Sequence, residues 1–175
     1  QKNCTNEAYL NRINQYHDLL DHSLGDSANR LRDENRILNT QRFNNLLDKH
    51  DDQPIYIVFW NAQFAGSVII SNLPEYKAFE EKNREKLKMI YVCIDESKNK
   101  HLWSARILDN DWNSEHYFMP AEDNENTLKD FSTKDIASFC YGAATYAIIN
   151  EKGDINTNAK SPMELVYQDV SKYLE

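Results

Sequence analysis

Residues 55–60 read Ile55-Tyr56-Ile57-Val58-Phe59-Trp60, a continuous run of β-branched and aromatic side chains that follows Pro54. A run of this kind, without alternating polar residues, is typical of a strand that is buried on both faces of a sheet. A second such run covers residues 88–95 and reads Lys88-Met89-Ile90-Tyr91-Val92-Cys93-Ile94-Asp95. The two runs predict two core strands, over residues 55–60 and 88–94.

The chain beyond residue 60 alternates helical and extended patterns. Helical periodicity and capping residues predict helices over residues 73–86, 98–108 and 134–139, and a last helix from Pro162. Extended patterns predict a short piece at residues 116–119, a third strand at 144–150 and a fourth at 154–157, with the turn Glu151-Lys152-Gly153-Asp154 before the fourth. This order predicts an α/β fold with a mixed central sheet, in which the first strand lies between the second and the third and helices cover both faces.

The first 50 residues have helical patterns. Apolar residues of the range 6–21 recur on one helical face, and a more polar helical pattern runs over residues 28–47. A break near Asn39 and Thr40 interrupts the second pattern, and Thr40 is a candidate cap for a new helix. We therefore expect an N-terminal helical segment over residues 1–50, followed by one domain over residues 51–175.

Composition argues against several classes of function. The 175 residues include 28 acidic and 20 basic ones, a net charge of −8, which disfavours nucleic acids and anionic membrane surfaces as partners. No apolar stretch approaches the roughly 18 residues that mark a membrane-spanning helix. Three cysteines, Cys4, Cys93 and Cys140, are too few for a disulfide scaffold and too far apart for a zinc motif. We expect neither a metal site nor a cofactor.

Three strings carry a resemblance to a known family. Leu46-Leu47-Asp48-Lys49-His50 precedes the first core strand, Phe59-Trp60 closes that strand, and residues 145–155 form the third strand with its hairpin. Together they resemble the TlpA/ResA-like thiol-disulfide oxidoreductases of the bacterial envelope, a branch of the thioredoxin superfamily, over about residues 42–175. The resemblance implies a thioredoxin-like fold and a location in the periplasm or cell envelope of a bacterium.

The chemistry of that family depends on groups that this chain lacks. The family uses a thiolate at a helix N-terminus, where the helix dipole and backbone N–H groups lower its pKa, and a second cysteine one turn later. A buried acid moves protons, and a cis-proline shapes the substrate groove. Aligned forward from Trp60, the two cysteine positions hold Phe64 and Ser67, and the acid position holds Val58. Aligned back from the hairpin, the proline position holds Ala144.

The register between residues 61 and 74 has a second alternative. Aligned back from Pro74, the cysteine positions hold Gly66 and Ile69. Neither alignment recovers a cysteine, because residues 61–92 contain none. A cis peptide bond before a residue other than proline costs about 2.5–4 kcal/mol, so we expect the bond between Ala143 and Ala144 to be trans.

These losses imply that the dithiol mechanism is absent. The resemblance then implies a non-catalytic thioredoxin-like module, used for binding or as a structural domain, and not an enzyme. Its candidate binding site, the former active-site region, comprises Trp60, Phe64, Ala65, Gly66, Ser67, Ala143 and Ala144. The alternative is an oxidoreductase of the thioredoxin family that acts through an unconventional cysteine. Cys93 and Cys140 are more simply read as core residues, because the first strand should separate them.

The segment after residue 60 is apolar where a redox enzyme would have an exposed polar helix start. It contains Phe64 and the run Val68-Ile69-Ile70, and exposed apolar groups of this size invite association. Two interpretations remain open. Either the N-terminal helices of the same chain cover the segment, or it is a docking patch for a protein partner. In both cases we expect these side chains to be covered.

Overall fold

The computed structural model describes residues 36–49, 53–123 and 143–174. Its centre is a five-stranded mixed sheet with the order β3-β2-β1-β4-β5. The strands are β1 (Ile55–Trp60), β2 (Lys88–Asp95), β3 (His116–Pro120), β4 (Thr145–Ile149) and β5 (Ile155–Asn156). Strand β1 runs parallel to β2 and antiparallel to β4, and β2 runs parallel to β3. The predicted position of the first strand, between the second and the third, is confirmed.

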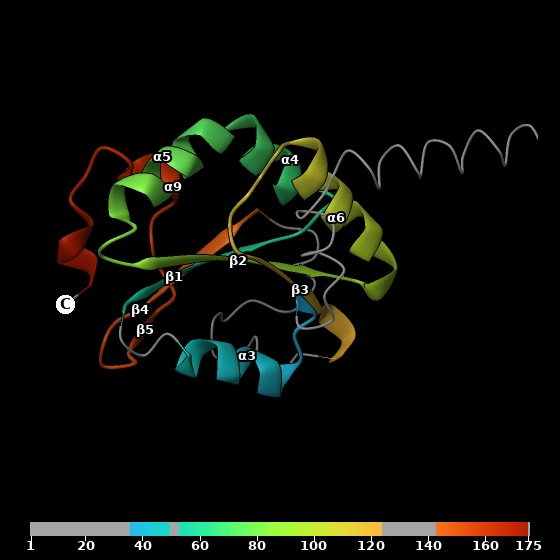
Figure 1. The fold of residues 1–175 in the computed structure, drawn as a ribbon, viewed down its shortest axis with the longest axis horizontal. Helices are drawn as coiled ribbons and strands as arrows, with labels where there is room; N and C mark the ends of the chain where they lie inside the picture. The colour runs from blue at the N-terminus through green and yellow to red at the C-terminus, as the bar shows by residue number, and fades with distance from the viewer. Residues whose placement is uncertain (1–35, 50–52, 124–142, 175) are drawn as a thin grey trace, which may run out of the picture.

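Helices cover both faces of this sheet, as predicted. Their bounds are α3 (Thr40–Asp48), α4 (Ala65–Ser71), α5 (Leu73–Asn83), α6 (Lys100–Asp109) and α9 (Pro162–Leu165), with 3₁₀ turns at Ser97–Asn99, Ala121–Asp123 and Val170–Tyr173. Figure 1 shows α4, α5, α6 and α9 on one side of the sheet and α3 on the other. The expected helices over residues 6–21 and 134–139 lie outside the described residues, and the domain division at residue 50 stays a prediction.

The helical pattern over residues 28–47 is interrupted at the predicted place, near Asn39 and Thr40. Just before this point, Ile37 forms a parallel bridge with Phe118 at the edge of the sheet. Helix α3 starts only after it, and its cap is Asn39, whose Oδ1 accepts a hydrogen bond of 2.8 Å from the backbone N–H of Arg42. The last helix begins at Pro162 as predicted, but α9 ends at Leu165, and Val170 lies in a separate 3₁₀ turn.

The core is divided between the two faces of the sheet by the alternation along β1. Tyr56, Val58 and Trp60 face the cluster under α4, α5, α6 and α9, while Ile55, Ile57 and Phe59 face the cluster over α3. All six side chains are buried, as the unbroken apolar run predicted. The position that would hold a buried acid in a redox enzyme, Val58, is therefore part of an entirely apolar strand.

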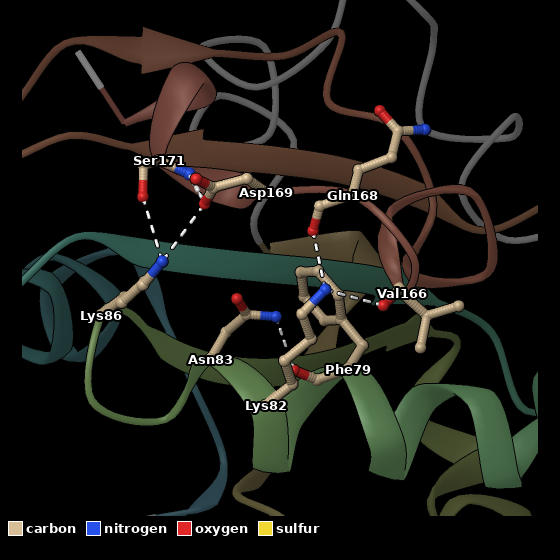
Figure 2. Close-up of polar contacts among 8 residues, drawn as sticks. All are labelled: Phe79, Lys82, Asn83, Lys86, Val166, Gln168, Asp169 and Ser171. Carbon is tan, nitrogen blue, oxygen red and sulfur yellow. Dashed lines mark hydrogen bonds and ion pairs between the residues drawn. The ribbon is translucent and has the colours of Figure 1, made fainter.

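Two lysines, one on α5 and one in the turn after it, hold the C-terminal segment (Figure 2). Nζ of Lys82 donates to the carbonyl oxygens of Val166 and Gln168, at 3.0 and 2.9 Å. In the turn that follows α5, Nζ of Lys86 lies 3.2 Å from Oδ1 of Asp169. A cation at the last carbonyls of a short helix offsets their missing hydrogen bonds. These contacts hold the C-terminal segment against the helical layer of the fold.

The hairpin between β4 and β5 has the predicted turn. Oδ1 of Asn150 accepts hydrogen bonds from the backbone N–H groups of Lys152 and Asp154, at 3.0 and 2.9 Å. Gly153 has φ of +82°, a conformation that glycine adopts without the steric cost of a side chain. Every one of these contacts joins residues at most four positions apart, so the turn is specified locally.

Candidate functional site

The candidate site begins where β1 ends, in the turn that leads to α4. Asn61 is fully buried there. Its Oδ1 accepts hydrogen bonds from the backbone N–H groups of Phe64 and Ala65, at 2.6 and 3.3 Å. Its carbonyl oxygen accepts a third, of 2.8 Å, from the N–H of Gly66. A helix leaves the N–H groups at its start without acceptors of its own, and here Asn61 alone accepts hydrogen bonds from three of them.

A buried carboxylate ties the turn to the neighbouring strand. Asp95 is the last residue of β2 and is fully buried. Its Oδ2 accepts from the backbone N–H of Ala62 at 3.2 Å, and its Oδ1 accepts from Nδ2 of Asn99 at 2.7 Å and from the N–H of Glu96 at 2.9 Å. A buried carboxylate needs several such donors to offset its lost hydration. The carboxyl ends of β1 and β2 are therefore joined through Asp95.

An arginine joins α6 to the same turn. Nε of Arg106 donates to the carbonyl oxygen of Ala62 at 3.3 Å, and Nη2 donates to Oγ of Ser67 at 3.2 Å. Within the described part of the chain, no carboxylate forms an ion pair with this guanidinium. The side chain is half-buried, so it presents a fixed positive charge beside the start of α4.

Helix α4 lies so close to β1 that only glycine fits at residue 66. A Cβ atom on Gly66 would lie 2.9 Å from Cζ3 of Trp60 and 3.1 Å from the carbonyl oxygen of Asn61. The Trp60 ring is itself held in the core, with its centroid 5.2 Å from that of Trp112. The alignment that puts cysteine positions at Gly66 and Ile69 therefore places one where no side chain fits and the other at a fully buried residue.

A histidine is buried behind this wall of aromatic rings. The His116 ring stacks on that of Tyr91, with 5.0 Å between the ring centroids. It lies edge-on to the Trp112 ring, with 4.4 Å between the centroids. Its Nε2–H donates to the carbonyl oxygen of Trp112 at 3.1 Å. Burial lowers the pKa of His116 to about 3, because the lost hydration of the charged form outweighs both the hydrogen bond to the Trp112 carbonyl and the nearby charge of Glu115. The imidazole is therefore neutral at physiological pH.

The surface of the site is made by the outer side of α4. Phe64 and Val68 are 53% and 57% exposed, and Ser67 is exposed between them, whereas Ile69 is buried. Ile69 is therefore covered as expected, because its side chain packs in the core. Of the two expected sources of cover for Phe64 and Val68, residues 1–35 lie outside the described residues and a partner is not part of the structure, so that part stays a prediction.

The remaining predicted residues lie beside the end of β1. Phe59 pairs with Thr145, so the chain just before β4 runs next to Trp60. Ala144 is half-buried against the core cluster that contains Trp60, and Ala143 is exposed. The peptide bond between the two alanines is trans, as expected. Sheet pairing therefore brings the two ends of the predicted site together.

The described residues offer little for redox or metal chemistry. Cys93 is fully buried in β2, while Cys4 and Cys140 lie outside the described residues. In the same part of the chain, no group of His, Cys, Asp or Glu is arranged to hold a metal ion. No described helix is long and apolar enough to cross a membrane.

Three residues of the site were missed from the sequence. Asn61 carried a readable signal, since asparagine directly after a strand is a common cap for the helix that follows. Asp95 was read only as the last residue of a strand. For Arg106 the sequence holds no signal, because its partners Ala62 and Ser67 lie 44 and 39 positions away.

Comparison with known proteins supports the fold. No family model matches the chain, and no curated protein matches it. The thioredoxin domain of a thiol-disulfide oxidoreductase from Bacteroides vulgatus superposes with a TM-score of 0.53 at 13% identity, over 74% of this chain and 84% of that one.

Two further solved structures are similar to a lesser degree. A solution structure from Bacteroides vulgatus, assigned as a thiol-disulfide oxidoreductase, gives a TM-score of 0.49 at 22% identity, over 66% of this chain and 69% of that one. A secreted disulfide oxidoreductase of Mycobacterium tuberculosis gives a TM-score of 0.45 at 10% identity, over 68% of this chain and 81% of that one. Likeness at these identities concerns the fold and not the chemistry. The superposition on the thioredoxin domain from Bacteroides vulgatus, together with the sheet order and the placement of the helices, shows that this chain has a thioredoxin-like fold.

Proposed function

We propose that this chain is a non-catalytic thioredoxin-like module that binds a protein partner through the start of α4. The forward alignment puts Phe64 and Ser67 at the two cysteine positions. Both side chains are exposed at the start of a helix that follows the central strand, which is where a reactive pair would have to lie. Neither side chain is a thiol, so dithiol exchange has no nucleophile at this place.

The observation that carries the proposal is the cap formed by Asn61. A thiolate at a helix start is stabilised by backbone N–H groups that point at it. Here the N–H groups of Phe64 and Ala65 already donate to the side chain of Asn61, and that of Gly66 to its carbonyl. The turn is organised to fix α4 in place, and its donors are not directed at a reacting group.

A binding role is supported by what the turn presents. Phe64 and Val68 are one helical turn apart, so their side chains share one face of α4. Two large apolar groups exposed together are typical of an interaction surface. We propose that the surface extends over Phe64, Ser67 and Ala143, with Trp60, Ala65, Gly66 and Ala144 as its support.

The bacterial envelope is the proposed location. It rests on the resemblance of residues 145–155 and of the strings around the first strand to envelope oxidoreductases. A module of this kind would recognise its partner where its relatives perform thiol exchange.

Reduction of insulin by dithiothreitol tests the absence of redox activity. We expect the full chain to leave the rate at the background of dithiothreitol alone, while a catalytic thioredoxin measured in parallel raises it. A rate above background that is lost in Cys93→Ser or Cys140→Ser would refute the proposal and support an oxidoreductase that acts through an unconventional cysteine.

A further inference from the structure

A row of oxidisable aromatic rings runs through the core from the end of β1 to β2. The ring centroids of Trp60 and Trp112 are 5.2 Å apart, and those of Trp112 and Tyr91 are 4.7 Å apart. All three side chains are at most 1% exposed. Centroid separations of this size place neighbouring rings in contact. An electron can therefore pass from one ring to the next without crossing water.

Trp60 is the end of this row that lies at the candidate site. The backbone of α4 rests on its ring, because a Cβ atom on Gly66 would lie 2.9 Å from Cζ3 of Trp60. The row therefore leads from the start of α4 into the core, where it reaches Tyr91 in the middle of β2.

Tyr91, at the other end of the row, has a path for its proton. Burial and the charge of Glu80 raise the pKa of Tyr91, so the phenol is protonated at neutral pH. Its hydroxyl interacts with Ser114, and Oγ of Ser114 donates a hydrogen bond of 2.6 Å to Oε2 of Glu80. A phenol that loses an electron becomes strongly acidic. Ser114 and Glu80 then connect the oxidised phenol to a carboxylate.

The other groups beside Tyr91 are poorer proton acceptors. Its hydroxyl donates to Sδ of Met89 over 3.6 Å, and a thioether is a weak acceptor. His116 stacks on the Tyr91 ring, but a pKa of about 3 makes its imidazole a weak base. Burial raises the pKa of Glu80, so its carboxylate holds a proton more readily than an exposed one does.

We infer that Tyr91 is a redox-active tyrosine, which supplies one electron through Trp112 to Trp60 after a one-electron oxidant has oxidised Trp60. A tyrosine that can pass its proton to a base is easier to oxidise than tryptophan, so the electron vacancy moves towards Tyr91. The step uses no thiol. It goes beyond the proposed binding role and does not depend on it.

Electrons and protons balance in this step. Trp60 loses one electron to the oxidant and regains one from Trp112, which regains one from Tyr91. The phenol gives its proton to Oγ of Ser114, and the proton of Ser114 passes to Glu80. The products are two neutral indoles, a neutral tyrosyl radical and a protonated carboxyl group. A reductant such as ascorbate then supplies one electron, and the proton returns from Glu80 to the phenolate.

Laser photo-oxidation of the native chain tests the inference. A flash at the long-wavelength edge of tryptophan absorption removes an electron from the indoles, and a cobalt(III) ammine complex takes up that electron and becomes cobalt(II). Transient absorption follows the tryptophan and tyrosyl radicals, which have separate bands. We expect the tyrosyl radical to form as the tryptophan radical decays, at a rate that is independent of protein concentration and lower in D₂O.

Two variants with matched controls assign the radical and its proton acceptor. Tyr91→Phe should abolish this formation of tyrosyl radical. Tyr76→Phe, which changes the next ring at a centroid distance of 6.5 Å, should leave it unchanged. Glu80→Gln should slow the transfer by about tenfold or more, because a positioned base is lost. Glu85→Gln, at an exposed position, should keep the native rate. Circular dichroism checks the fold of each variant.

Three results would overturn the inference. The first is a tyrosyl radical that forms at the native rate in Tyr91→Phe. The second is a transfer in Glu80→Gln that is as fast as in the native chain. The third is a tryptophan radical that decays in the native chain without a tyrosyl radical. Each would leave the proposed binding role as it stands, because that role requires no electron transfer.

Discussion

Two turns at opposite ends of the sheet are built on an asparagine, and they serve different purposes. Asn150 opens the β4–β5 hairpin, and Asn61 opens the turn between β1 and α4. In both, the side-chain oxygen accepts hydrogen bonds from two backbone N–H groups further along the chain. Asn150 is partly exposed, whereas Asn61 is fully buried. The same asparagine hydrogen bonding makes a chain reversal in the β4–β5 hairpin and fixes the start of α4 at the candidate site.

Long-range contacts make the difference. The hydrogen bonds described for the hairpin turn lie within residues 150–154. The Asn61 turn also depends on Asp95, 33 positions from Ala62, and on Arg106, 44 positions from it. A change in the hairpin should therefore stay local, while a change at the site should reach α4, α6 and β2 together.

Acid should affect the site end most strongly, because His116 is buried neutral behind Trp60 and Trp112. Its pKa of about 3 lies below the value of about 6.5 expected in the unfolded chain, so between these values the unfolded chain binds more protons. Above pH 6.5 His116 is neutral in both the folded and the unfolded chain, and its burial costs no stability through protonation. As the pH drops from 6.5 towards 3, the free energy of unfolding falls by on the order of 1.4 kcal/mol per pH unit. Urea unfolding at several pH values measures this slope.

A histidine variant isolates the effect. His116→Gln should remove this part of the acid slope, because glutamine binds no proton in this pH range. An identical acid slope in His116→Gln and the native chain would contradict the assignment.

The two asparagines can be compared directly by replacing each with alanine. Asn61→Ala leaves two N–H groups at the start of α4 without their acceptor in a buried place, which should cost about 2–3 kcal/mol of stability. Asn150→Ala exposes its N–H groups to water, and we expect a loss of about 0.5–1 kcal/mol. Urea unfolding measures both losses, and equal losses would mean that the buried turn is not the more constrained one.

The two described glycines extend the comparison. Gly66→Ala places a methyl group 2.9 Å from the Trp60 ring and should cost about 1–3 kcal/mol, with a change in tryptophan fluorescence. Gly153→Ala meets no atom within 4 Å and should cost only the backbone strain of a positive φ, about 1–2 kcal/mol, with no change in fluorescence. A fluorescence change in both variants, or in neither, would refute this distinction.

The register of the former active site is tested by restoring cysteines. Phe64→Cys with Ser67→Cys places two thiols at exposed positions on the first turn of α4, and we expect them to form a disulfide on mild oxidation with little loss of stability. The matched pair Gly66→Cys with Ile69→Cys should instead destabilise the fold, because Gly66 has no space for a side chain. Thiol titration and thermal unfolding distinguish the two, and the reverse result would favour the alignment from Pro74.

The sequence predicted the elements whose contacts are local and missed those that depend on long-range contacts. The strands over 55–60 and 88–95 were readable because their burial leaves an unbroken apolar run, and the hairpin because the hydrogen bonds described for its turn are local. The break before α3 was also predicted, but its cap is Asn39 and not Thr40, while the pairing of Ile37 with Phe118 is a long-range contact that the local pattern does not contain. Arg106 could not be found, because only the folded chain brings it to Ser67. The candidate site was therefore located by resemblance, while the contacts that organise it came from the structure.

The central claim is that the start of α4 keeps the place of a thioredoxin active site without its thiol chemistry. The most direct measurement is the rate at which the full native chain catalyses insulin reduction with dithiothreitol. The account predicts a rate equal to that of dithiothreitol alone at every protein concentration. A rate that rises in proportion to the concentration of the native chain, and falls when Cys93 or Cys140 is replaced by serine, would contradict it.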